Sequence, residues 1–255
     1  MSVIFYFSGT GNSLAAAKTA AGALTRCRLE TMPDYLDKPY EVKDECVGFV
    51  CPVYCFALPP IVQEFLKAFR GTPRYTFAII TMGANQGRAL FQLREMLKEK
   101  NVELDYAEAI AMPDNIFITP PKKAAQMLAE AAPRLKEIAA NIASGQKDTS
   151  KCVEKPLWKN IGIPLGYWFM KNVLKIGNVG ARVNRCTCCG LCAKVCPVGN
   201  IEFTGRPHFG DKCAWCFGCR NWCPALAIRI GGMRKKADER YTHPDIKIQE
   251  MFRKR

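Results

Sequence analysis

Apolar runs alternate with segments of helical periodicity along the first 145 residues. The apolar runs are short and nearly continuous, which predicts strands, whereas the segments between them repeat their apolar positions every three or four residues, as helices do. The predicted strands are residues 2–7, 28–31, 47–53, 75–81 and 104–112, and the predicted helices are residues 14–24, 60–69, 88–100 and 122–142. Strands that are apolar throughout are typical of a parallel sheet covered on both faces. The pattern therefore predicts an α/β fold with a doubly wound parallel sheet over residues 1–145.

This alternation stops after residue 145. Residues 146–180 mix lysines with aromatic and aliphatic side chains, and their glycines and prolines leave no apolar run long enough to span a bilayer. We interpret this segment as a linker or docking segment whose apolar side packs between two domains, or as an amphipathic stretch at a membrane surface. A small second domain is predicted at residues 181–232, followed by a basic C-terminal tail at residues 233–255.

Charge is concentrated in the C-terminal part of the chain. The 255 residues include 37 basic and 23 acidic side chains, for a net charge of +14, and residues 181–255 alone hold 15 basic and 6 acidic ones. A basic region of this kind suits an acidic protein, an anionic membrane surface or nucleic acid. We expect much of the excess to balance bound anionic groups. An acidic partner protein and peripheral membrane contact are then favoured, and a specific nucleic acid is not expected.

The sequence C-x2-C-x2-C-x3-C-P occurs twice, from Cys186 to Pro197 and from Cys213 to Pro224. This run is typical of bacterial proteins with two [4Fe–4S] clusters, in which the fourth cysteine of each copy binds the cluster of the other copy. The expected ligands are Cys186, Cys189, Cys192 and Cys223 for the first cluster, and Cys213, Cys216, Cys219 and Cys196 for the second. Zinc sites usually pair two C-x2-C knuckles, and disulfide frameworks belong to small secreted domains. Two clusters are therefore favoured over zinc or disulfides.

Six of the 14 cysteines lie outside these ligand sets. Cys188 lies between two expected ligands and is an alternative to Cys189, while Cys51 and Cys55 are either a redox pair or small buried hydrophobes. His243 is expected at the surface. The chain starts with a strand-like apolar run and no basic leader, so we expect a reducing, cytoplasmic location.

The segment Ser8-Gly9-Thr10-Gly11-Asn12-Ser13 follows the first predicted strand and leads into a helix. A helix N-terminus offers free N–H groups and a favourable dipole to an anion. The two glycines let the backbone close around a phosphate, and Ser8, Thr10, Asn12 and Ser13 add side-chain donors. The segment matches neither the G-x4-G-K-[ST] nor the G-x-G-x-x-G pattern. It is interpreted as a phosphate-binding loop, with a hydroxyl-rich helix cap as the alternative.

This loop resembles the phosphate-binding loop of flavodoxins, and with the two cysteine motifs the chain resembles the flavodoxin–ferredoxin fusions called ferrodoxins over most of residues 1–230. The resemblance implies a flavodoxin-like domain that binds FMN, joined to a small α+β ferredoxin domain with two [4Fe–4S] clusters. It also implies two loops that hold the flavin ring after later strands. The residues concerned are Pro52, Val53, Tyr54, Thr81, Met82, Gly83 and Gly87. Tyr54 is the candidate to stack on the ring, or else a core residue.

These parts together predict an electron-transfer protein that relays electrons between FMN, two clusters and an external redox partner. With only two histidines and no Ser-His-Asp, paired-carboxylate or H-E-x-x-H arrangement, the sequence offers few general bases, and no catalytic residue is assigned. The alternative is a flavin and iron–sulfur oxidoreductase that reduces a quinone or another small acceptor. A cluster-containing nucleic-acid-binding or sensor protein is the third interpretation.

Overall fold

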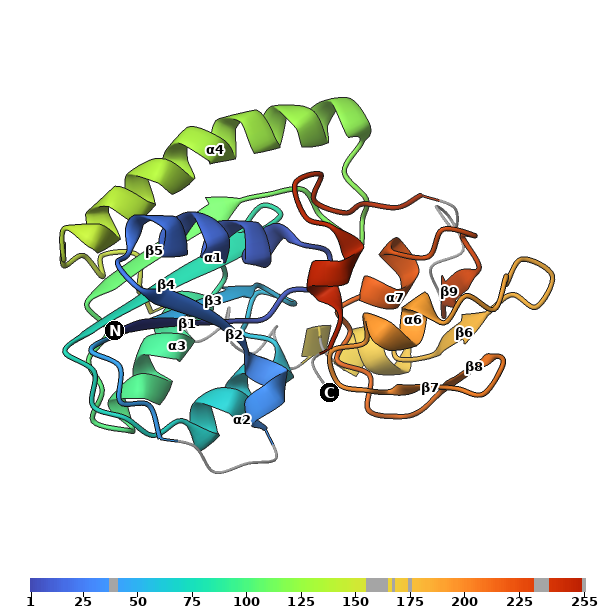
Figure 1. Ribbon diagram of the computed structural model, residues 1–255, viewed down its shortest axis with the longest axis horizontal. Coiled ribbons are helices and arrows are strands. Elements are labelled where there is room, and N and C mark those ends of the chain that lie inside the picture. Colours follow the sequence, from blue (N-terminus) through green and yellow to red (C-terminus); the bar gives the residue numbers. More distant parts are fainter. Residues whose placement is uncertain (37–40, 155–164, 167, 174–175, 232–238, 254–255) are drawn as a thin grey trace. The chain divides into compact units, whose positions relative to one another are not determined.

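A five-stranded sheet organises the N-terminal part of the chain (Figure 1). The computed structural model describes residues 1–36, 41–154, 165–166, 168–173, 176–231 and 239–253. The strands are β1 (Ser2–Tyr6), β2 (Cys27–Thr31), β3 (Cys46–Pro52), β4 (Tyr75–Met82) and β5 (Tyr106–Ala111). Their order is β2-β1-β3-β4-β5, and every neighbouring pair is parallel. This is the strand order of the flavodoxin-like fold. The predicted doubly wound sheet is thus confirmed.

Helices connect these strands and cover both faces of the sheet. They are α1 (Asn12–Ala23), α2 (Pro60–Ala68), α3 (Ala89–Lys98) and α4 (Pro121–Ala143), with a short 3-10 helix, η1 (Met32–Tyr35), after β2. Helices α1 and α4 lie on one face, and α2 and α3 on the other (Figure 1). Every strand and helix predicted within residues 1–145 is present, with bounds that differ by at most two residues.

Side chains that alternate along the strands build two apolar layers. On one face, Ile4 and Val50 pack with the alanines of α1 and the aliphatic side chains of α4. On the other face, the ring of Phe5 lies 5.0 Å from that of Phe65 in α2. Burying one such aromatic or aliphatic side chain stabilises the fold by about 1.5–3 kcal/mol. Helices therefore cover both faces of the sheet, and the loops that follow the strands lie at its carboxyl edge.

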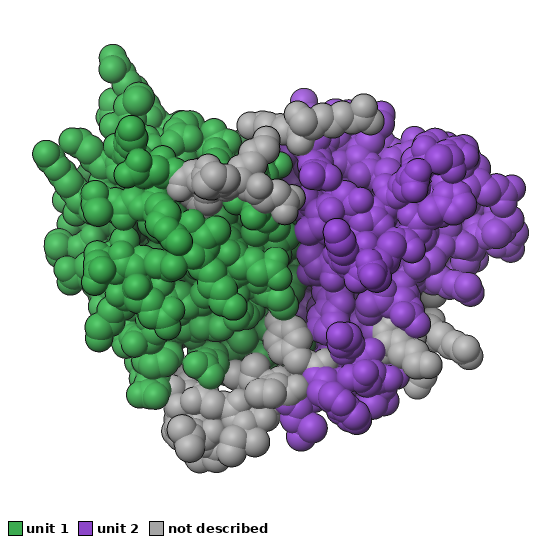
Figure 2. Space-filling view, turned by 90° about the horizontal axis from the view of Figure 1, so that it is seen from below, with its two compact units in different colours: residues 1–8, 12–113, 120–157 green, residues 9–11, 114–119, 158–255 purple. Residues whose placement is uncertain are grey.

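The chain forms two compact units, coloured separately in Figure 2. Unit 1 comprises residues 1–8, 12–113 and 120–157, and unit 2 comprises residues 9–11, 114–119 and 158–255. Unit 2 therefore combines the C-terminal part of the chain with two short loop segments that follow β1 and β5.

Unit 2 contains an internal repeat in which corresponding residues are 27 positions apart, as Cys186 and Cys213 are. The first copy consists of β6 (Val179–Ala181), α6 (Leu191–Lys194) and β7 (Ile201–Phe203), and the second of β8 (Pro207–Phe209), α7 (Gly218–Asn221) and β9 (Ile228–Ile230). Strand β6 pairs with β9, and β7 pairs with β8, both antiparallel. Each two-stranded sheet thus joins one strand from each copy. A second 3-10 helix, η2 (Ile248–Met251), lies near the C-terminus.

The predicted linker falls partly outside the described residues, which exclude Trp158, Ile161 and Ile163. In the described part, Leu165, Trp168 and Phe169 are exposed rather than packed, whereas Met170 and Ile176 join an apolar cluster of unit 2. No helix within the described ranges is long and apolar enough to cross a membrane.

Candidate functional site

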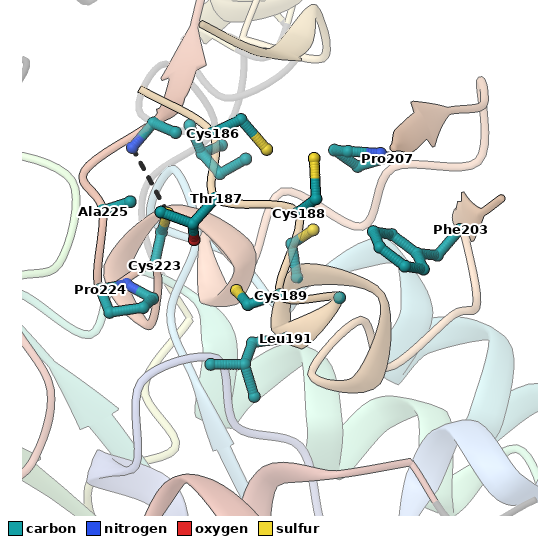
Figure 3. A pocket seen from close by; sticks show the side chains of 14 residues that line it. Cys186, Thr187, Cys188, Cys189, Leu191, Phe203, Pro207, Cys223, Pro224 and Ala225 are labelled. Carbon is teal, nitrogen blue, oxygen red and sulfur yellow. Dashed lines mark hydrogen bonds between the residues drawn. The ribbon is translucent and has the colours of Figure 1, made fainter. Parts of the chain in front are cut away.

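A first cavity in unit 2 is lined by cysteines from both sequence motifs (Figure 3). The four expected ligands of the first cluster all border it: Cys186, Cys189, Cys192 and Cys223. Cys188, Phe203 and Pro207 border the same cavity (Figure 3). Three of the four expected ligands therefore come from the first motif and one from the second.

A second cavity repeats this arrangement with the roles of the motifs reversed. Its lining includes the four cysteines expected for the second cluster: Cys196, Cys213, Cys216 and Cys219. Apolar side chains such as Val179, Ile201 and Phe217 complete the wall. The two cavities thus divide the eight motif cysteines into the two expected sets, with the fourth cysteine of each motif exchanged.

The backbone follows the same path in both motifs. Cys188 and its counterpart Trp215 have φ angles of 54° and 56°, and Gly190 and its counterpart Phe217 have φ angles of 71° and 57°. These left-handed residues curl the chain around each cavity before the short helices α6 and α7 begin. The helix then carries the fourth cysteine away from its own motif. A left-handed conformation is uncommon for non-glycine residues, and here it recurs at matched positions beside the cysteines.

Backbone amides donate to the exchanged cysteines in both copies. The N–H of Asn200 donates to Cys196 Sγ at 3.2 Å, and the N–H of Ala227 donates to Cys223 Sγ at 3.3 Å (dashed in Figure 3). These donors are again 27 positions apart. Hydrogen bonds to sulfur stabilise a thiolate and tune the potential of a metal group attached to it.

Burial works against the thiolate form of these cysteines. It raises the pKa of Cys192 to about 11 and that of Cys216 to about 12, and it raises the pKa of Cys219 well above its ordinary value. A cation is therefore needed to keep such thiols ionised. Within the residues that the structure describes, no three His, Cys, Asp or Glu side chains are grouped as a single metal ion requires. The cysteines border the two cavities described above.

The predicted phosphate loop connects β1 to α1, which starts at Asn12. The hydroxyl-bearing residues Ser8, Thr10 and Ser13 are all buried. In unit 1, Ser13 Oγ lies 2.8 Å from Thr81 Oγ1, and Asn12 Nδ2 donates to the carbonyl of Pro113 at 2.9 Å. The first amides of α1 have no acceptor within the helix, so the loop combines buried hydroxyls with a positive helix end.

The middle of this loop packs within unit 2. Trp222 Nε1 donates to the Gly9 carbonyl at 3.2 Å, and the N–H of His243 donates to the Thr10 carbonyl at 2.8 Å. A Cβ atom on Gly9 would overlap the carbonyl group of Cys216. Glycine is therefore required at position 9 by the close approach of the second cysteine motif. The expected surface position of His243 is wrong, because its side chain is only 6% exposed.

The two loops expected at the flavin ring contact each other in unit 1. Cys55 and Phe56 have φ angles of 48° and 62°, and Tyr54 and Ala57 exchange two backbone hydrogen bonds of 2.9 and 3.0 Å around them, as in a tight two-residue hairpin. Gly87, with φ 57°, lies directly against the backbone of Phe56. The loop after β4 therefore supports the turn after β3.

Tyr54 is buried, with its ring 6.2 Å from that of Phe7 in an edge-to-face arrangement. The aromatic side chain that this turn exposes is Phe56, 57% exposed. Sequence reasoning did not select Phe56, because the turn that lifts it from the core carries neither glycine nor asparagine at its two central positions. Cys51 is fully buried, which raises its pKa above the ordinary value and does not suit an exposed redox pair with Cys55.

Comparison with known proteins found no matching family model and no matching curated protein. Among solved structures, a flavodoxin from Megasphaera elsdenii is 17% identical and covers 56% of this chain and 99% of its own, with a TM-score of 0.37. An FMN-dependent NADH-azoreductase from Bacillus anthracis is 11% identical over 56% and 99%, with a TM-score of 0.39. The Trp repressor binding protein from Bacillus subtilis is 9% identical over 54% and 99%, with a TM-score of 0.38. The fold assignment stands on the strand order itself.

Proposed function

We propose that unit 2 binds two [4Fe–4S] clusters, one in each cysteine-lined cavity. The observation that carries this proposal is the division of eight cysteines between two cavities, with one cysteine of each motif exchanged. Cys186, Cys189, Cys192 and Cys223 would hold one cluster, and Cys213, Cys216, Cys219 and Cys196 the other. The amides of Asn200 and Ala227 would stabilise the exchanged thiolates.

FMN is proposed as the second kind of cofactor, bound at the carboxyl edge of the flavodoxin-like sheet. The buried hydroxyls of Ser8, Thr10 and Ser13, beside the N-terminus of α1, fit a phosphate group. Two loops, each with the strand end that precedes it, would border the ring. The end of β3 and the loop after it contain Pro52, Val53 and Tyr54, and the end of β4 and the loop after it contain Thr81, Met82, Gly83 and Gly87. Exposed Phe56 is the aromatic side chain that this turn offers to the ring.

The resulting protein is an electron-transfer protein of the flavodoxin–ferredoxin fusion type. A flavin carries one or two electrons and each cluster carries one, so the cofactors supply the redox chemistry. The chain would supply the cluster ligands, exclude water from a buried thiol such as that of Cys216, and set the surrounding charge. Electrons would pass between FMN, the two clusters and an external redox partner in the cytoplasm.

Cofactor content tests this proposal directly. Protein purified without oxygen should contain about eight iron atoms and about one FMN per chain. Stoichiometric zinc without iron would overturn the cluster assignment. Iron without flavin, after incubation with FMN, would leave a two-cluster protein whose flavodoxin-like unit has another role.

A small-acceptor assay separates an electron carrier from an oxidoreductase. The reduced protein is mixed with a soluble quinone, and turnover is measured with a continuous supply of reductant. A carrier should reduce the quinone no faster than free FMN does at the same concentration, whereas saturable turnover would establish the oxidoreductase.

A further inference from the structure

The two cysteine cavities differ at positions that the internal repeat makes equivalent. Cys189 is exposed, whereas its counterpart Cys216 is only 8% exposed. Two residues of the same unit contact the carbonyl group of Cys216: Gly9 lies against it, and Asn115 Nδ2 donates a hydrogen bond to it. Phe203, beside the first cavity, is 38% exposed, and its counterpart Ile230 is 4% exposed. Two residues that line the first cavity are thus exposed, whereas their counterparts in the second copy of the repeat are buried.

The charged residues next to the two cavities also differ, with more positive charge near the first. Arg185 precedes the first-cavity cysteine Cys186, Arg206 precedes the lining residue Pro207, and both arginines are exposed. The chain has no acidic residue between Glu154 and Glu202, a stretch that includes the whole first motif. At the second cavity, exposed Lys212 follows directly on exposed Asp211, so the two charges offset each other.

Apolar side chains complete the surface at the first cavity. Val183 is 68% exposed and lies three residues before Cys186 in the sequence, and Phe203 lines the cavity (Figure 3). Two exposed apolar side chains and two exposed arginines therefore either line this cavity or lie within three positions of a lining residue. This combination suits a protein of opposite charge, because charge steers the encounter and apolar contact holds it. We call Val183, Arg185, Phe203 and Arg206 the first-cavity face.

We propose that the first-cavity face is the docking surface for a small acidic electron-transfer protein, and that electrons leave or enter through the cluster of the first cavity. This inference rests on the proposed function, because it needs a cluster in that cavity. One electron would pass from the reduced first cluster to the oxidised partner, so that the cluster is oxidised as the partner is reduced.

The experiment uses an acidic rubredoxin as the probe. The cluster-loaded protein is photoreduced without oxygen and mixed with oxidised rubredoxin, and the second-order rate constant is measured from the bleaching of rubredoxin. The double variant Arg185→Glu, Arg206→Glu should lower this constant about ten-fold or more at low ionic strength, and the difference should shrink as salt is added. A basic cytochrome c should accept electrons from the variant at least as fast as from the natural chain.

The internal repeat supplies a matched control. Lys212 is the counterpart of Arg185, and Lys247 is an exposed lysine of unit 2 whose sequence neighbours do not border the first cavity. The double variant Lys212→Glu, Lys247→Glu changes the total charge equally but leaves the first-cavity face intact. Its rate constant with rubredoxin should fall much less.

Three results would overturn the docking proposal. Equal losses in both double variants would show that total charge, and not this face, sets the rate. Unchanged rates in a protein with about eight iron atoms would remove the docking surface while leaving the cluster assignment intact. Binding to vesicles of phosphatidylcholine and phosphatidylserine that is lost in Arg185→Glu, Arg206→Glu, with unchanged rubredoxin rates, would assign the face to lipid. A natural chain without iron would overturn this inference and the proposed function together.

Discussion

Single thiols decide which metal group the cavities can hold. Five cysteines border the first cavity, one more than a [4Fe–4S] cluster needs, and the extra one is Cys188. Its counterpart in the second copy is Trp215, which has the same left-handed conformation but cannot bind iron. Because the position is occupied by an indole in one copy, the fold requires its backbone conformation and not its thiol. We therefore assign Cys188 no ligand role.

Replacing two of these cysteines should separate a ligand from its neighbour. Cys223→Ser should reduce the iron content from about eight to about four atoms per chain, because only the first cavity loses a thiolate. Cys188→Ser should keep about eight. Iron analysis and the visible absorbance of anaerobic protein measure both. A loss of iron in Cys188→Ser, but not in Cys189→Ser, would exchange the roles of these two residues.

His243 is buried and bound through its backbone N–H to the loop between β1 and α1, and its imidazole should make the stability of the protein depend on pH. Burial lowers the pKa of its imidazole, whereas the unfolded chain takes up a proton near pH 6.5. The stability that depends on the neutral ring is therefore present above pH 6.5 and is lost as the pH falls below it. The free energy of unfolding should drop between pH 7.5 and pH 5.5, by at most about 1.4 kcal/mol per pH unit. Anaerobic urea denaturation of the natural chain and of His243→Gln measures the difference. An equal pH slope in both proteins would contradict this role of His243.

At the scale of elements, strand β3 depends on a glycine in its interior. A Cβ atom at Gly48 would overlap the ring of Phe77 on the neighbouring strand β4, with Cε1 2.8 Å away. The ring fills the place of the missing side chain. This contact explains why a residue that usually weakens strands lies in the middle of a buried one.

Two glycine-to-alanine changes should therefore have opposite effects. Gly48→Ala should lower the free energy of unfolding by about 1–3 kcal/mol, because Phe77 must move. Gly22→Ala, in helix α1 with nothing within 4 Å of the new methyl group, should raise it by about 0.5–1 kcal/mol. Thermal denaturation of both variants gives the signs, and a neutral Gly48→Ala would show that the ring has room to turn.

The sheet was predictable because its signals are local. Val47–Val50 and Phe77–Ile80 are apolar throughout, so strands could be placed at these runs from the sequence alone. The short strands of unit 2 have three residues each, too few for any periodicity. Strands β7 and β8 pair across a short turn, whereas β6 pairs with β9 at the far end of the repeat, and such distant pairing leaves no local pattern.

In the candidate site too, some features could be predicted from the sequence and others could not. The cysteine spacing predicted which four motif cysteines border each cavity together, because the fourth cysteine is exchanged in this type of motif. Nothing near Gly9 indicated that the carbonyl of Cys216 would lie against it, because these residues are more than 200 positions apart. Likewise, Tyr54 is buried and Phe56 is exposed because Cys55 and Phe56 form a left-handed turn, and the residues at this turn do not indicate one.

At the scale of the whole molecule, the two units differ in the interactions that stabilise each of them. Unit 1 has continuous apolar layers on both faces of its sheet, whereas an apolar cluster among the described residues of unit 2 has three buried members, Ile176, Phe217 and Ile230. Small domains with little apolar core usually depend on metals or disulfides. The proposed clusters would therefore carry much of the folding free energy of unit 2.

Removing iron should unfold unit 2 and spare unit 1. After oxidation with ferricyanide and chelation with EDTA, amide hydrogen exchange should become fast across residues 186–230 and stay slow in β1, β3 and β4. Mass spectrometry of peptides from the full-length protein measures both regions at once. Unchanged protection in unit 2 would show that its fold does not need the metal.

Because the fourth cysteines are exchanged, the two cysteine sets are completed at different times during translation. The second cavity is complete once Cys219 has left the ribosome, but the first waits for Cys223, although three of its four thiols are synthesised much earlier. During that interval Cys186, Cys189 and Cys192 are an unfinished set that can bind the wrong ion or be oxidised. A nascent chain that stalls between residues 192 and 223 would therefore be more vulnerable to metal stress than either the shorter or the finished chain.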